Sequence, residues 1–378
     1  MFDRHQRHCV VTLLAVSGFA GAAGLPEAAR SQDTKAVRSL LTQKVDVNAR
    51  SSDGSTALLW LAHWNEVEAA DLLLKAGADA NMANDFGMTP LSQACTNGSA
   101  EFVRLLLKSG AKPNTAIATG ETPLMTCAKT GNVDAVRLLV EFGAAVNAKE
   151  PAQNQTPIMW AAAERHSDVV GALIAAHADL KAHTKEGFTP IHFSARMGDL
   201  ESIKLLLAAG VDVNIQTQTN QAPSADSEEP AITIGLTRAA RVGGAPGYTP
   251  LLVATLRAQV DVALYLLDHG ADPNIEAAGF TPLHWASTTW EGYSANPVYG
   301  FEDPMSGIPD RQAKLRLVKA LLAHGAKVNA RMTKRQPSFA TGYTDAIGAT
   351  PLLLAASVQD SEMMRILLKS ECRHSKER

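Results

Sequence analysis

The sequence predicts an all-α solenoid, in which short pairs of helices stack side by side along one axis. The first observation is a Thr that is followed by Pro or Ala and then by Leu or Ile, at successive intervals of 33, 33, 34 and 33 residues. This mark occurs at Thr56, Thr89, Thr122, Thr156, Thr189, Thr249, Thr281 and Thr350. The second observation is an Asn that closes segments such as "GADAN", replaced once by Lys181. It occurs at Asn81, Asn114, Asn147, Asn214, Asn274 and Asn329. A fixed period of this length is typical of stacked repeats.

The Thr mark predicts where the first helix of each unit begins. A Thr hydroxyl can accept a hydrogen bond from a free backbone N–H at a helix start, and Pro fits the first turn because its missing N–H is not needed there. A glycine such as Gly98, Gly131 or Gly198 then permits a tight turn into the second helix.

The second helix of each unit is predicted by apolar residues at helical spacing, as in Val103, Leu106 and Leu107. It is expected to end at a glycine in the left-handed conformation, as at Gly110 or Gly143. Acidic residues recur at the entry of this helix, and we interpret them as capping residues. They are Asp134, Glu201 and Asp261.

The whole unit reads G-x-T-P-L-x-x-A followed by V-x-x-L-L-x-x-G-A-D-x-N, and it resembles the ankyrin repeat from about Pro26 to Lys369. The resemblance implies about nine helix-turn-helix units with β-hairpin-like fingers, stacked into a curved rod with an extended concave surface. The first unit, residues 26–48, lacks the Thr-Pro-Leu mark and is expected to cap the array.

Three insertions interrupt the repeat, near residues 215–246, 290–312 and 331–346. The stretch from Pro282 to Asn329 is about twice as long as its equivalent from Pro190 to Asn214, which places the middle insertion between the two helices of one unit. Loops on rigid scaffolds often carry function. Apart from these insertions, residues 23–378 are expected to form one elongated domain.

The first 22 residues do not fit the repeat. Arg4 and Arg7 precede a short apolar run, which ends at the small residues Ala20, Gly21 and Ala22. This order is that of a secretory signal peptide. An uncleaved membrane anchor is the alternative, which the short, glycine-rich run disfavours. We therefore expect an exported protein, periplasmic or secreted, with no stable membrane span after cleavage.

The composition is that of an ordinary folded domain, with 46% hydrophobic residues and with 35 basic against 38 acidic side chains. A nucleic-acid-binding protein would be expected to carry a strongly basic surface, so this balance argues against that class of partner. We expect a monomer.

The cysteines leave two interpretations open. Cys95 and Cys127 lie at equivalent positions of adjacent first helices, where other units have Ala. We favour small buried thiols in the core, with a disulfide between the two helices as the alternative. Cys372 is expected to be exposed, and no haem attachment motif is present.

No sequence motif of a known catalytic or phosphate-binding site occurs, and we expect no catalytic, cofactor-binding or metal-binding residues. His192 and His284 stand at the fourth position of the "TPLH" segments. We expect these rings to be held in a hydrogen-bond network rather than to ionise for chemistry.

Aromatic residues mark the candidate site. Four units place Trp or Phe four residues after their Thr, a position that in the ankyrin family faces the concave groove. Such aromatic anchors are common in binding hot spots, whereas packing on a neighbouring unit is the alternative role. The predicted partner-binding residues are Trp60, Trp64, Trp160, Phe193, Trp285, Trp290, Tyr293, Tyr299 and Phe301.

The sequence thus favours a non-enzymatic protein that binds another protein, or a peptide segment of one, through the groove and the inserted loops. Two alternatives remain. One is a ligand-binding or catalytic site built at the Trp285 to Phe301 insertion. The other is an accessory module of an extracytoplasmic redox protein.

Overall fold

The computed structural model describes residues 24–218, 247–288, 311–334 and 347–376, and in these the regular structure is helical. The helices follow one another in pairs. The first helices are α1 (Leu25–Arg30), α3 (Ala57–Trp64), α5 (Pro90–Thr96), α7 (Pro123–Thr130), α9 (Pro157–Ala163), α11 (Pro190–Met197), α14 (Pro250–Leu256), α16 (Pro282–Ala286) and α18 (Pro351–Ser357). The second helices are α2 (Thr34–Thr42), α4 (Val67–Lys75), α6 (Ala100–Lys108), α8 (Val133–Glu141), α10 (Ser167–Ala175), α12 (Leu200–Ala208), α15 (Val260–Asp268), α17 (Arg311–Ala323) and α19 (Ser361–Lys376).

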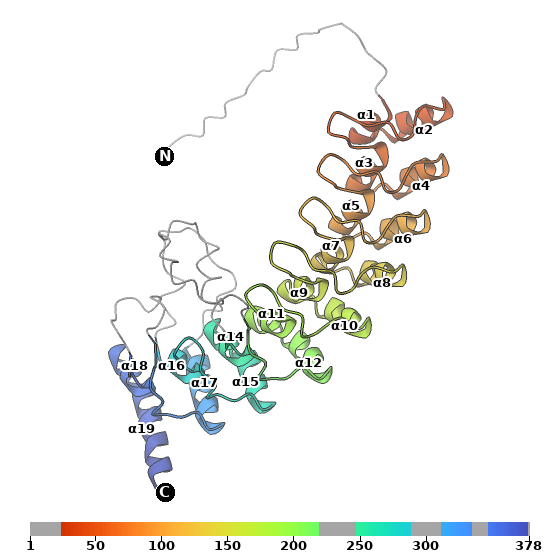
Figure 1. Cartoon of the computed structure of the whole chain (residues 1–378). Coiled ribbons are helices and arrows are strands. Elements are labelled where there is room, and N and C mark those ends of the chain that lie inside the picture. The colour runs from red at the N-terminus through yellow and green to blue at the C-terminus, as the bar shows by residue number, and fades with distance from the viewer. Residues whose placement is uncertain (1–23, 219–246, 289–310, 335–346, 377–378) are drawn as a thin grey trace, which may run out of the picture.

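The pairs stack into a curved solenoid, as the sequence predicts. Figure 1 shows the first helices in a row along the inner side of the arc and the second helices along its outer side. Each first helix packs against the first helix of the next pair, and the second helices do the same in their own row. The loops that precede the first helices contain antiparallel bridges between Arg50 and Thr56 and between Ala277 and Phe280.

Several of the predicted regions lie outside the described residues. These are the signal peptide and most of each of the three insertions, and the number of repeats therefore stays a prediction as well. The described part of the degenerate first unit contains the helices α1 and α2.

The predicted threonine caps are confirmed in most pairs. Thr89 is extended at the N-cap of α5 and its Oγ1 accepts the backbone N–H of Ser92 at 3.1 Å. The equivalent cap bond is made in the units that begin at Thr56, Thr122, Thr249 and Thr350.

The predicted acidic caps of the second helices are wrong. The N-cap of α8 is Asn132, whose side chain accepts the N–H of Ala135, while Asp134 lies in the first turn and pairs with Arg137. A capping residue stands just before the first residue of the helix, and Asn132, two residues before Asp134, has that place. Glu201 and Asp261 likewise lie in first turns and pair with Lys204 and Arg316.

Most second helices end at glycines with positive φ, as predicted, whereas Lys44 after α2 and His177 after α10 adopt this conformation without being glycines. Gly110 has φ 87° and Gly143 has φ 83°. The turns between the helices also use this conformation, with φ 80° at Gly131. Glycine adopts it without the steric cost that a Cβ would impose, and this lets each helix end sharply enough to fit the next unit.

One continuous hydrophobic cluster runs from Leu25 in α1 to Leu367 in α19. Phe102, Val103 and Leu106 of α6 are fully buried in it. The alanines of the first helices allow close approach between neighbouring pairs, and the leucines of the second helices fill the space between them. Each pair is thus stabilised mainly by its neighbours.

The repeating asparagines form a ladder between consecutive units. Asn81 donates from Nδ2 to the carbonyl of Gly110 at 3.1 Å and accepts the N–H of Lys112 at 2.8 Å. The same two bonds are made by Asn48, Asn214 and Asn274, and Asn114 makes them with Gly143 and Ala145. Each Asn therefore fixes the turn of the unit that follows.

Lys181 interrupts this ladder. Its backbone is placed as in the other units, because its N–H donates to Asp179 just as the N–H of Asn81 donates to Asp79. An ammonium group cannot accept the N–H of Asp212. A hollow of about 280 Å³ lies at this step, lined by residues that include Lys181, Gly210 and Asp212.

The favoured interpretation of the cysteines is also corrected. Cys95 and Cys127 are fully buried, as expected, but they are joined as a disulfide, with 4.6 Å between their Cα atoms. Adjacent first helices approach closely because alanine-sized residues separate them, and this brings the two sulfur atoms together. Cys372 is exposed in α19, as predicted.

Replacing Lys181 by Asn is expected to stabilise the array by about 1–2 kcal/mol, because it restores two hydrogen bonds between units. The free energy of unfolding, measured by urea titration, tests this. The reverse change, Asn114→Lys, serves as the matched variant and should destabilise the array by a similar amount. Equal stability of Lys181→Asn and the wild type would show that the ladder contributes little at this step.

Candidate functional site

The inner row of helices presents the predicted aromatic residues at equivalent positions. Trp60 of α3, Trp160 of α9 and Trp285 of α16 are half-buried against the core. Phe193 of α11 is buried, with 9% of its surface exposed. The remaining loop aromatics lie outside the described residues. They are Trp290, Tyr293, Tyr299 and Phe301.

A cationic side chain of the preceding unit lies over the ring of two of these aromatics. The guanidinium of Arg30 lies 5.2 Å from the ring centroid of Trp60, and the ammonium of Lys129 lies 5.1 Å from that of Trp160. Arg30 and Lys129 lie in the last turns of the first helices α1 and α7, so the stacking of consecutive units creates both pairs. A cation over an indole face is attracted by its π electrons.

The same two tryptophans have unsatisfied indole groups. Nε1 of Trp60 and Nε1 of Trp160 are buried and have no hydrogen-bond partner among the residues that the structure describes. A buried donor without a partner costs about 1–3 kcal/mol. Trp64, in contrast, is 39% exposed and its Nε1 donates to the carbonyl of Arg30 at 3.1 Å.

Phe193 and Trp285 have more of a packing role. Trp285 stacks on Phe280 of its own unit, with 5.8 Å between ring centroids. The ring centroid of Phe193 lies 6.2 Å from that of Phe188, and the two rings are tilted against each other. The structure therefore places four of the predicted aromatics in one row, with cations over Trp60 and Trp160 and with aromatic residues of the preceding loops beside Phe193 and Trp285.

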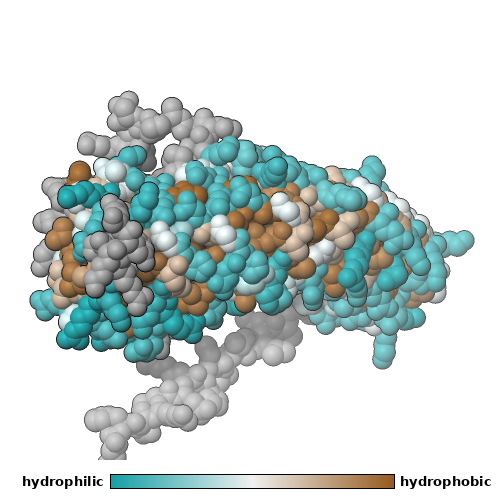
Figure 2. Space-filling view, turned by 90° about the horizontal axis from the view of Figure 1, so that it is seen from below, coloured by the Kyte–Doolittle hydropathy of each residue, from teal (hydrophilic) through white to brown (hydrophobic). Residues whose placement is uncertain are grey.

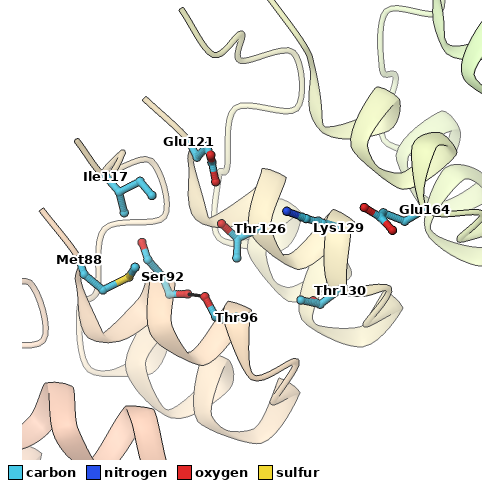
Figure 3. A pocket seen from close by; sticks show the side chains of 9 residues that line it. All are labelled: Met88, Ser92, Thr96, Ile117, Glu121, Thr126, Lys129, Thr130 and Glu164. Carbon is cyan, nitrogen blue, oxygen red and sulfur yellow. Dashed lines mark hydrogen bonds between the residues drawn. The ribbon is translucent and has the colours of Figure 1, made fainter. Parts of the chain in front are cut away.

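The aromatic row is interrupted between Trp60 and Trp160. At the equivalent positions α5 has Gln93 and α7 has Thr126. A pocket of about 340 Å³ lies here, and Figure 3 shows its lining side chains coming from α5, α7, the loops before them and the end of α9. They are Met88, Ser92, Thr96, Ile117, Glu121, Thr126, Lys129, Thr130 and Glu164. Sequence reasoning missed this pocket, although Gln93 and Thr126, which stand where the flanking units have tryptophan, could have indicated it.

The opposite surface has a different character. Figure 2 shows a band of apolar residues along the array, bordered by hydrophilic ones. Among the described residues, Phe142 at the end of α8 and Leu205 of α12 belong to the outer row and are 39% and 38% exposed.

The two buried histidines are held in a hydrogen-bond network, as predicted, and the structure shows that they also cap their helices. Nδ1 of His192 accepts from the backbone N–H of Thr189, so the proton lies on Nε2, which donates to the carbonyl of Tyr248 at 2.9 Å. His284 makes the equivalent bonds to Thr281 and Ala330. Burial lowers the pKa of both rings, to about 4 for His192. They therefore join consecutive units as neutral groups.

In the described part of the chain, no three His, Cys, Asp or Glu side chains group together as a metal site would require. Within the same residues, no helix is both long and apolar enough to span a membrane.

The comparison with known families identifies the fold. A family model of ankyrin repeats in three copies matches residues 25–117, 114–184 and 151–217, and a single-repeat model matches 246–277 and 278–333. These matches cover more than half of the sequence, and the chain belongs to the ankyrin-repeat family. Members of this family are generally protein–protein interaction modules, and the fold is typically a non-enzymatic scaffold.

One relative and one solved structure show how far the similarity extends. Protein PhlB of Serratia liquefaciens is 38% identical over 147 residues, which are 38% of this chain and 53% of PhlB. This chain thus spans about half the length of that relative. The human ASB11 ankyrin repeat domain is 29% identical, with a TM-score of 0.46, over 51% of this chain and 86% of that domain.

Acidification is expected to destabilise the array through His192. The ring is neutral in the native state, whereas the unfolded chain takes up a proton below the ordinary pKa of 6.5. The free energy of unfolding should therefore fall as the pH falls from 6.5 to about 4, by on the order of 3 kcal/mol. Urea titrations of the wild type and of His192→Gln across this range test the effect.

His192→Gln should show a shallower pH dependence than the wild type, because it lacks the buried ring. An identical slope for His192→Gln and the wild type would contradict the assignment. His284 contributes in the same direction because burial also lowers its pKa.

Proposed function

We propose that this chain is a scaffold without enzymatic activity that binds another protein, or an extended segment of one, along its inner face. The observation that carries the proposal is the partial burial of Trp60 and Trp160 together with their unsatisfied indole N–H groups. Both rings are half-buried and both indole N–H groups lack a partner in the described residues. A core residue that served packing alone would be expected to have its polar atom satisfied.

The composition of the inner face supports a protein partner. The tryptophans offer broad apolar surface, Arg30 and Lys129 offer charge, and a pocket lies between the two positions. Interfaces are enriched in tryptophan and arginine, and their energy is concentrated in a few such residues. The array is rigid along this face because its units are joined by the core and the asparagine ladder, so little ordering of the chain would oppose binding.

The inserted loops are part of the proposed surface. Trp290, Tyr293, Tyr299 and Phe301 belong to the insertion that follows α16, and Trp285 stands at its start. We propose that these residues extend the binding surface beyond the groove. Trp64 and Phe193 would contribute at its margins, and the chain would act as a monomer with no nucleic-acid partner.

The alternative ligand-binding or catalytic site falls on the same insertion, most of which lies outside the described residues. The one titratable ring beside it, His284, is occupied as a cap between units. An accessory role in a redox system has no specific observation in its favour.

We also propose that the protein is exported, to the periplasm or to the medium. The arrangement of the first 22 residues and the disulfide between Cys95 and Cys127 support this, because disulfides persist in oxidising compartments. Protein isolated from its own cells is then expected to begin near Ala23 and to hold both cysteines oxidised. Mass spectrometry after alkylation without reduction measures both properties, and a main species that retains Met1 with free thiols would contradict export.

Replacing Trp60 and Trp160 by Ala is expected to weaken partner capture at least tenfold, which corresponds to the loss of one binding hot spot. The measurement is affinity capture from the extracytoplasmic fraction of the source cells, with quantification of each retained protein. Phe142→Ala serves as the control because it removes an exposed aromatic ring from the outer row. Circular dichroism melts establish that each variant is folded.

Capture that survives in the folded double variant, with the same retained protein, would place the binding surface elsewhere. A further variant, Trp290→Ala with Tyr293→Ala, then decides whether the inserted loop carries the binding.

A further inference from the structure

The side chains that line the pocket between α5 and α7 offer more hydrogen-bond acceptors than donors. Thr96 Oγ1 donates to the carbonyl of Ser92 at 3.1 Å, and Thr126 Oγ1 donates to the carbonyl of Thr122 at 3.4 Å. Thr130 Oγ1 donates its single proton toward the carbonyls of Cys95 and Cys127, each at 3.1 Å. A hydroxyl has one proton and two lone pairs. These three side chains therefore offer the pocket acceptors and no donors, whereas Ser92 Oγ accepts from Thr89 Oγ1 and keeps its own proton.

The charges of the pocket point the same way. Two carboxylates line it, those of the half-buried Glu121 and the exposed Glu164, and neither forms an ion pair with a described residue. The one lining cation is Lys129, whose ammonium is held over the ring of Trp160. The lining residues thus carry a net charge of −1, because they include two carboxylates and one ammonium group.

The walls of the pocket include two apolar side chains. Met88 and Ile117 belong to the loops that precede α5 and α7, and both are half-buried. Figure 3 shows them on the loop side of the pocket, with the threonines on the helix side. An occupant would therefore meet apolar surface along one side and acceptors along the other. The volume, about 340 Å³, lies at the small end of the range for ligand sites.

We propose that this pocket receives a basic side chain of the protein partner, and that arginine is the residue it fits best. The inference rests on the proposed function and names the chemistry of one contact within it. An arginine has an apolar stem that can lie along Met88 and Ile117. Its planar guanidinium carries five N–H donors, enough to serve carboxylates and hydroxyl oxygens together, whereas a lysine has three donors around one point.

The pocket lies on the inner face, where the proposed partner segment would run. It lies between Trp60 and Trp160, where the aromatic row of the inner face is interrupted by Gln93 and Thr126. A partner segment along the groove would meet an indole on each side and enter the pocket between them. The small side chain of Thr126 is what leaves this space open.

The test uses three short probes with the full chain, namely acetylated and amidated Gly-Ser-X-Ser-Gly peptides in which X is arginine, lysine or glutamate. Methyl-labelled protein reports binding through the NMR signals of Met88 and Ile117. The arginine probe is expected to shift these signals in a saturable manner with a dissociation constant of about 1 mM, the lysine probe more weakly and the glutamate probe not at all. The shifts should diminish in higher salt.

Two sets of variants locate the site. Glu121→Gln combined with Glu164→Gln should weaken binding of the arginine probe about tenfold or more, because it removes both charges and keeps the shape. Glu68→Gln combined with Glu101→Gln is the matched control, since both residues are exposed on the outer helices α4 and α6. Thr126→Trp should abolish binding by filling the pocket with the side chain that α3 and α9 have at the same position.

Equal shifts with the arginine and glutamate probes, or undiminished arginine binding in the Glu121→Gln, Glu164→Gln variant, would overturn this proposal. The probe experiment does not depend on the natural partner, so its failure leaves capture through Trp60 and Trp160 untouched. Conversely, loss of the proposed function would appear as capture that is insensitive to the tryptophan variants while the arginine probe still binds.

Discussion

No helix pair of this protein can bury its apolar face alone, and every other feature follows from that constraint. The hydrophobic cluster is continuous from α1 to α19 because each pair uses its neighbours as its core. A structure of this kind is stable only if consecutive units keep the same relative orientation. The threonine caps fix where each first helix begins, and the asparagine ladder fixes the turn of the next unit.

This constant orientation turns sequence positions into rows on the surface. In the described units a residue four places after the Thr lies on the inner face, and residues in the last turn of the first helix lie beside the next unit. Trp160 and Lys129 therefore meet although they belong to different repeats. The inner row can vary without loss of the fold because the buried alanines and leucines carry the stability. Exchange of a tryptophan for Thr126 opens a pocket instead of disrupting the stack.

The insertions are accommodated for the same reason. Asn214 reaches the carbonyl of Gly270, and His192 reaches that of Tyr248, although residues 219–246 intervene in the chain. The contacts between units thus pass directly across the stack and do not depend on the length of the connecting loop. Loop closure becomes only slowly more costly with length, so an array can extend its loops while the helices on either side stay in register.

The sequence by itself determined the repeat, the caps, the glycine turns and the position of the aromatic row, because each depends on the local conformation of a few consecutive residues. It misplaced the caps of the second helices, because the exact residue that is extended before a helix depends on how the preceding turn packs. It could not decide between thiols and a disulfide for Cys95 and Cys127, since pairing depends on the distance between two helices. The cations over Trp60 and Trp160 and the acceptor-rich pocket were likewise decided by the tertiary structure, because they arise only when side chains from neighbouring units are brought into contact.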